Sequence, residues 1–217
     1  MTLFDRTLDA APTPARDPTA PSPARRRMVV LGVLPAWAVL WSLTPGLLGD
    51  GVGSLVTSDP AGVVLVESAL ALLVAAVLAL AHRDWTRELF AAGPTRWLYA
   101  LPVAAGVVLP FHYGLPLPLA VYVVWMAASV LWQNYLTFGL LQGYLRRCFG
   151  PRVAVGLVAV VFALGHVLWL PERFGLGSPL AAAAMLVLGL VLASLRAGTR
   201  ALHANLALHL GFYLVFA

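Results

Sequence analysis

The chain has 217 residues, of which 61% are hydrophobic and only 11% are charged. This composition excludes an ordinary soluble domain and indicates a polytopic helical membrane protein. The net charge of +5 does not predict a nucleic-acid partner, because the arginines flank apolar segments, where they set orientation in a bilayer. A single cysteine, Cys148, excludes an intramolecular disulfide.

The first region in chain order is a stretch rich in proline and alanine, with scattered charges. Such a stretch cannot build a packed core, so we predict a disordered cytoplasmic tail over residues 1–27 and a transmembrane helical domain over residues 28–217. Three consecutive arginines, 25–27, precede the apolar run Met28–Leu48, as in a signal peptide. This run is long enough to cross a bilayer, which needs about 20 residues, and that favours an uncleaved first membrane helix.

Seven apolar segments are separated by turns that contain glycine, proline and aspartate. They are Met28–Leu48, Ala61–Ala81, Trp97–Tyr113, Pro118–Leu141, Val153–Leu170, Pro179–Leu195 and Ala201–Phe216. They predict an all-α bundle of about seven transmembrane helices. The third segment contains Pro102 and Pro110, so we expect a kinked or incompletely spanning helix. The pattern of the fourth continues to Arg146, as in a helix that leaves the membrane.

From residue 25 onward, the arginines lie almost entirely on one side of this seven-segment arrangement. They are Arg25, Arg26, Arg27, Arg83, Arg87, Arg96, Arg146, Arg147, Arg152, Arg196 and Arg200, and only Arg173 falls on the other side. Cytoplasmic loops of membrane proteins carry an excess of basic residues. We therefore predict a multi-pass protein of the cell (inner) membrane, with its N-terminus in the cytoplasm and its C-terminus outside.

Few polar side chains lie inside the apolar segments. They are Glu67, Gln133, Asn134, His166, His203, Asn205 and His209. At a rise of about 1.5 Å per residue, four of the helices carry such a side chain about 14 to 24 Å from the cytoplasmic arginines. Polar groups in a bilayer usually face a cavity or a partner. We therefore predict one shared intramembrane site.

Three blocks of the sequence follow the order of the motifs of a known family. The first is WQNYLTFGLLQGYLRRCFG over Trp132–Gly150, the second is FALGH over Phe162–His166, and the third is LGLVLASLRAGTRALHANLALHLGFY over Leu188–Tyr213. Together, over about Val121–Phe216, they resemble the CAAX-protease and bacteriocin-processing family, also called CPBP or Abi. The resemblance implies a CAAX-protease-like helical core in which glutamates activate water and histidines assist.

The chain departs from this family at the positions that carry the chemistry. Gln133 and Asn134 stand where the family has two adjacent glutamates, and Phe138 replaces its arginine. An amide does not take a proton from water near neutral pH, so the usual general base is missing. We therefore predict a catalytically inactive homologue that acts as a binding or accessory subunit of a membrane complex.

The resemblance also implies which residues remain at the site. His166 and His209 match the histidines of the second and third motifs, whereas Tyr213 replaces the family's later asparagine or aspartate. Asn205, one turn before His209, shares its helix face and is a substitute polar partner. The predicted binding pocket consists of Gln133, Asn134, His166, Asn205 and His209.

Alternatives to this interpretation start from the same residues. Glu67 is the only acid inside the segments. If it lies beside His166 and His209, it could replace the missing base of an active peptidase. The alternative is a protonated glutamate that is hydrogen-bonded to a neighbouring helix. The two amides at 133 and 134 could also serve only as hydrogen-bonding groups between helices. A small-molecule carrier is less supported, because the halves show no inverted repeat.

The expected partners follow from the same residues. Two histidines without a nearby carboxylate or thiolate form an incomplete metal site, so we expect no metal and no other cofactor. We expect contact with the lipid bilayer and with other membrane protein subunits or a prenylated or leader peptide, and no contact with nucleic acid.

Overall fold

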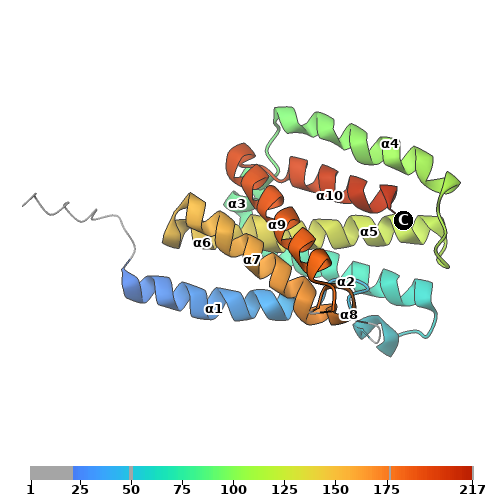
Figure 1. Cartoon of the computed structure of the whole chain (residues 1–217), viewed down its shortest axis with the longest axis horizontal. Coiled ribbons are helices and arrows are strands. Elements are labelled where there is room, and N and C mark those ends of the chain that lie inside the picture. The colour runs from blue at the N-terminus through green and yellow to red at the C-terminus, as the bar shows by residue number, and fades with distance from the viewer. Residues whose placement is uncertain (1–21, 49–50, 176, 217) are drawn as a thin grey trace, which may run out of the picture.

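The computed structural model describes residues 22–48, 51–175 and 177–216. Every regular element in these ranges is helical (Figure 1). The α-helices are α1 (Pro23–Trp41), α2 (Pro60–Ala81), α3 (Arg83–Leu89), α4 (Ala100–Val108), α5 (Leu119–Asn134), α6 (Gln142–Phe149), α7 (Pro151–Trp169), α8 (Pro171–Phe174), α9 (Pro179–Thr199) and α10 (His203–Val215). The 3₁₀ turns are η1 (Val52–Leu55), η2 (Pro94–Tyr99) and η3 (Leu109–Phe111), and η4 (Tyr135–Leu141) is a π-helix. Residues 1–21 of the tail that was predicted to be disordered lie outside the described residues.

The predicted all-helical membrane fold is confirmed. In the described ranges, four helices are long and apolar enough to cross a membrane: Pro60–Ala81, Leu119–Phe149, Pro151–Trp169 and Pro179–Thr199. The other three predicted segments are also helical but are not among these spans, and the first of them contains a shorter apolar helix, Val30–Trp41. The third is divided among η2, α4 and η3, as its prolines indicated.

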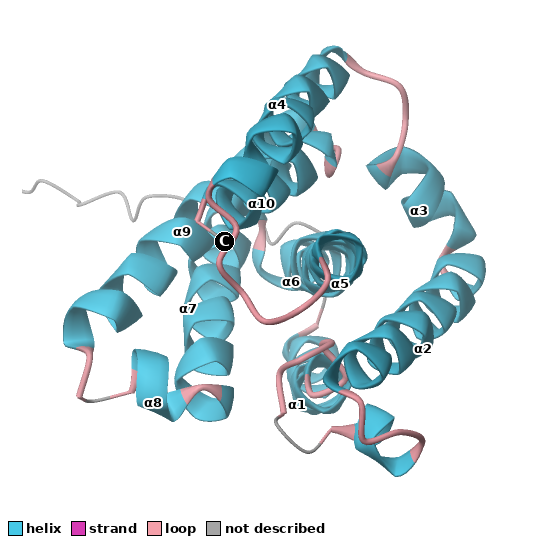
Figure 2. Ribbon diagram, turned by 90° about the vertical axis from the view of Figure 1, so that its right-hand side faces the viewer, coloured by secondary structure: helices cyan, strands magenta, loops and turns pink. Residues whose placement is uncertain are grey.

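The longest helix forms the centre of the bundle. Helices α5, η4 and α6 join into one span of 31 residues, more of which is buried than of the other spans. Figure 2 views α5 nearly along its axis, between α10 on one side and α1 and α2 on the other. The buried core collects around it and includes Trp41, Trp132, Phe138 and Phe162. Apolar side chains of α2 and α9 point outward, as expected for helices that face lipid.

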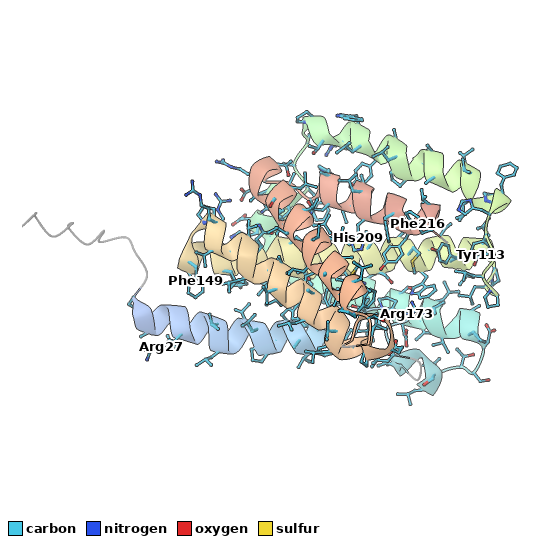
Figure 3. The ribbon with its side chains drawn as sticks, viewed as in Figure 1. Arg27, Tyr113, Phe149, Arg173, His209 and Phe216 are labelled. Carbon is cyan, nitrogen blue, oxygen red and sulfur yellow. The ribbon has the colours of Figure 1, made fainter. Side chains whose placement is uncertain are left out.

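Successive long helices run in alternating directions, so the described arginines other than Arg173 gather at one end of the bundle. Figure 3 shows Arg27 and Phe149 at this arginine-rich end, with Tyr113, Arg173 and Phe216 toward the other. The distribution agrees with the predicted alternation of the segments. Which end faces the cytoplasm stays a prediction.

The first helix differs from the expected one at both ends. Helix α1 begins at Pro23 and ends at Trp41, whereas Met28–Leu48 was predicted, because Pro45 and Gly46 end the apolar helix in a turn. Gly46 has φ +71°, a conformation that favours glycine. The short helix α3 and the π-helix η4 were not predicted from the sequence.

Candidate active site

A π-helix begins directly after the two amide residues. All seven residues of η4 are buried, and the element follows Asn134 without a break in the helix. The Trp37 indole N–H donates to Thr137 Oγ1 at 3.0 Å and so ties η4 to α1. Single π turns are found frequently at functional sites. The central helix therefore changes its geometry at the position where the sequence places the altered motif.

Asn134 and His209 form the centre of the site. The Asn134 amide nitrogen lies 2.8 Å from the Val130 carbonyl oxygen and 2.9 Å from His209 Nδ1. A carbonyl oxygen only accepts, so the nitrogen of Asn134, not its oxygen, must face both groups. The two amide hydrogens are then both donated, and His209 Nδ1 is an acceptor. This places the proton of the neutral imidazole on Nε2. Figure 3 shows His209 near the middle of the length of the bundle.

His166 lies beside the same aromatic ring as His209. Its Nδ1 donates to the Phe162 carbonyl oxygen at 2.9 Å, which leaves the lone pair on Nε2. The Phe162 ring centroid is 4.5 Å from that of His166 and 6.4 Å from that of His209. Trp41 and Phe174 also contact the imidazole edge-on. The structure thus brings both predicted histidines to one buried site and encloses His166 in aromatic rings.

Gln133 points toward a cavity next to this pair. The cavity has a volume of about 500 Å³, and Ser129, Gln133, Arg173 and Tyr213 are among its lining residues. Gln133 Oε1 is buried and has no hydrogen-bond partner among the described residues. The Tyr213 ring also stacks on His209, with centroids 5.2 Å apart. Tyr213 therefore separates the cavity from the buried imidazole.

Glu67 makes its hydrogen bonds to a loop, and none of those found in the described residues joins it to His166 or His209. Its carboxylate accepts hydrogen bonds from the backbone N–H groups of Gly46 at 2.7 Å and Gly53 at 3.4 Å. These residues belong to the connection between α1 and α2, and Gly46 also lines the cavity. The carboxylate therefore holds a loop at the cavity wall. The predicted placement of Glu67 in one site with His166 and His209 is not found, and its partners are loop amides rather than a neighbouring helix.

Asn205 also has a different partner from the one proposed. Its amide nitrogen donates to the Leu192 carbonyl oxygen of α9 at 2.9 Å, and its oxygen has no partner in the described part of the chain. Gln142, which the sequence interpretation did not single out, bonds the next carbonyl, that of Ala193, at 2.8 Å. Both amides connect α9 to its neighbours. Asn134, not Asn205, is the polar partner of His209.

Sequence reasoning missed the loop that covers the cavity. The Trp125 indole N–H donates to the Pro45 carbonyl oxygen at 2.7 Å, and the Ser129 hydroxyl donates to the same oxygen at 3.3 Å. A Cβ atom at Gly46 would overlap the Trp125 ring. The adjacent Pro-Gly pair was the available signal for a turn.

Among the described residues, those that line the cavity include no aspartate or glutamate. Across residues 22–48, 51–175 and 177–216, no three His, Cys, Asp or Glu side chains group as metal ligands. The nearest charged group lining the cavity is Arg173. The donors and acceptors at the site are thus mainly amides and imidazoles.

Comparisons with known proteins agree with the motifs. Residues 114–215 match the model of the family described as type II CAAX prenyl endopeptidase Rce1-like. The matched range includes all three of the motif-like sequence blocks. Uncharacterized proteins of Mycobacterium bovis and Mycobacterium tuberculosis are each 31% identical to the chain over 100 residues, which cover 45% of this chain and 80% of each relative. No solved structure matches the chain.

Proposed function

Because the chain belongs to the Rce1-like family of type II CAAX prenyl endopeptidases, we propose that it is a catalytically inactive member that binds a partner in the membrane. One observation carries this proposal: the amide of Asn134 donates to His209 Nδ1 at 2.9 Å. A glutamate or aspartate carboxylate in this place would accept a hydrogen bond from a protonated Nδ1. The amide reverses the direction of the hydrogen bond.

This reversal matters for hydrolysis. Activation of water needs a group that accepts its proton in the transition state. The His209 lone pair on Nδ1 is engaged by Asn134, and Nε2 carries the proton, so neither nitrogen is free to accept. Gln133, at the other glutamate position, is likewise an amide. Neither altered position supplies a base.

His166 retains a free lone pair, on Nε2. Its ring is only 6% exposed and lies against Trp41, Phe162 and Phe174. A histidine base also works best when a second group orients it and stabilises its charged form, as the carboxylate does in a catalytic triad. The one hydrogen bond of this imidazole goes to a backbone carbonyl, which gives little such support. His166 alone therefore does not restore the chemistry.

The cavity beside Gln133 supports binding instead. Its lining combines apolar side chains with the side chain of Gln133, whose amide can bond a peptide group, and with the cation of Arg173. Pockets with mainly apolar walls and a few placed polar groups are typical binding sites. We propose that an extended segment of another membrane protein occupies it and that the chain acts as an accessory subunit. In this proposal the chain resides in the cell membrane, with the arginine-rich end in the cytoplasm.

The first test is a peptidase assay on the purified full chain with prenylated peptides and leader peptides. We expect no product above the level of the His209→Phe variant. Cleavage that disappears in Glu67→Gln or His166→Ala would contradict the proposal and establish the alternative of an active peptidase.

The second test is purification from native membranes without added partner. We expect a stoichiometric companion that is lost in Gln133→Leu. Gln142→Leu is the matched control, because Gln142 is a buried glutamine of the same central helix that does not line the cavity. Recovery of the chain alone, or equal loss in both variants, would contradict the subunit role.

A further inference from the structure

A second, polar pocket lies toward the arginine-rich end of the bundle. It has a volume of about 370 Å³ and lies where α3, the central helix and the end of α9 meet. Arg146, Arg147, Arg196 and Arg200 line it, together with Trp85 and Glu88. It shares no lining residue with the cavity beside Gln133.

The charge of this pocket is strongly unbalanced. Four guanidinium groups and one carboxylate, that of Glu88, line it, which gives a formal charge of +3. Like charges held around one concavity repel each other, and low-dielectric walls strengthen that repulsion. A bound anion would convert the repulsion into attraction. An excess of arginine at one end of a membrane protein is ordinary, whereas its concentration around a single hollow is more specific.

Among the described residues, Arg196 is the lining residue whose side chain carries a buried, unpartnered donor. It is partly buried near the end of α9, and its Nε is buried without a hydrogen-bond partner in the described residues. A buried donor that lacks a partner destabilises the folded protein. An anion in the pocket would supply the acceptor. The next arginine, Arg200, ends the helix with φ +59° and so turns the chain beside the same pocket.

The wall opposite is held in place by close packing. The Arg147 guanidinium carbon lies 3.8 Å from the centre of the Trp85 ring, a cation–π contact that orients this arginine. A Cβ at Gly143 would come within 3.2 Å of the same ring, and one at Gly139 within 3.1 Å of Leu89. The two glycines, four residues apart, let α3 approach the central helix. The pocket therefore has a defined shape.

We infer that this pocket binds a phosphate group, carried either by an anionic lipid headgroup or by a soluble phosphate compound. Guanidinium groups bond phosphate oxygens in a planar, two-pronged geometry, and several of them around one centre match a group with several charged oxygens better than a single carboxylate. The lipid and soluble sources share this chemistry. The inference is independent of the proposed subunit role, since it uses other residues.

The experiment uses the full chain in phosphatidylcholine nanodiscs, with two separate additions. In one arm phosphatidic acid is included in the bilayer and retained lipid is measured by native mass spectrometry. In the other arm inorganic phosphate is titrated against chloride at equal ionic strength, and the thermal unfolding midpoint is followed. We expect saturable binding in one arm, which identifies the source of the phosphate.

The variants separate the pocket from general surface charge. Arg196→Gln and Arg146→Gln should each weaken binding about fivefold, the effect of about 1 kcal/mol per basic residue. Arg152→Gln removes the same charge at an exposed position near this end, outside the pocket, and should leave binding unchanged. Arg146 is exposed, so its variant remains informative if Arg196→Gln fails to fold. No binding in either arm, or an equal loss in Arg152→Gln, would overturn the inference.

Discussion

The hydrogen bond between Asn134 and His209 makes a quantitative prediction about stability. Asn134→Leu keeps the approximate volume but removes both donated hydrogens, so His209 Nδ1 and the Val130 carbonyl lose a partner. Each lost bond is worth about 0.5–1.5 kcal/mol, and loss of the unpartnered Asn134 oxygen offsets part of this. We expect the free energy of unfolding to fall by about 2 kcal/mol.

A double-mutant cycle isolates the bond itself. His209→Phe keeps an aromatic ring against Tyr213 but has no ring nitrogen. Polar pairs between membrane helices couple by about 0.6 kcal/mol on average and about 1.7 kcal/mol at most. We expect Asn134→Leu combined with His209→Phe to be less destabilised than the sum of the single variants, by about 1 kcal/mol.

The assay is unfolding of the purified protein in mixed micelles with increasing denaturing detergent, followed by tryptophan fluorescence. The control cycle pairs His209→Phe with Gln142→Leu, whose amide bonds the Ala193 carbonyl instead. This control should be additive within about 0.5 kcal/mol. A coupling near zero for Asn134 and His209 would refute the hydrogen-bond assignment, and so would equal coupling in the control.

Two further predictions concern the packing around the two pockets. Gly143→Leu should lower the free energy of unfolding by about 1–3 kcal/mol, because the new leucine side chain would displace Trp85. Gly156→Ala should not destabilise the protein, because the space around Gly156 is open. Thermal unfolding compares the two variants. Glu67→Gln should speed hydrogen exchange in the loop between α1 and α2, because an amide is a weaker acceptor for the Gly46 N–H than a carboxylate; unchanged exchange in that loop would show that the carboxylate does not hold it.

Much of the fold could be predicted because it depends on properties that act locally along the chain. The apolar runs, their turns and the placement of arginines identified the helices and their alternation. The break in the third segment followed from Pro102 and Pro110 alone. The helix α3 was missed because it is only seven residues long and carries charges, while its one buried residue, Leu89, packs through tertiary contacts.

The site was predicted less completely, because the depth of a residue along its helix does not determine the direction in which its side chain points around the helix axis. Counting residues placed Glu67 near the level of the histidines, but its carboxylate faces a loop at the cavity wall. The π-helix η4 leaves no mark in the apolar pattern. The pairing of His209 with Asn134 rather than Asn205 depends on how α5 and α10 pack, which spacing within one helix does not reveal. That Gln133 and Asn134 have different surroundings follows from helix geometry, because adjacent side chains on a helix point about 100° apart.

The proton position on His209 tests the central claim most directly. Nitrogen-15 NMR of the histidine-labelled protein, with His209→Phe used to assign the signals, distinguishes a protonated from an unprotonated Nδ1. The hydrogen bond from Asn134 predicts an unprotonated, hydrogen-bonded Nδ1 and a protonated Nε2. A proton on Nδ1 would leave Nε2 free to accept a proton from water, and would contradict the account of a site without a base.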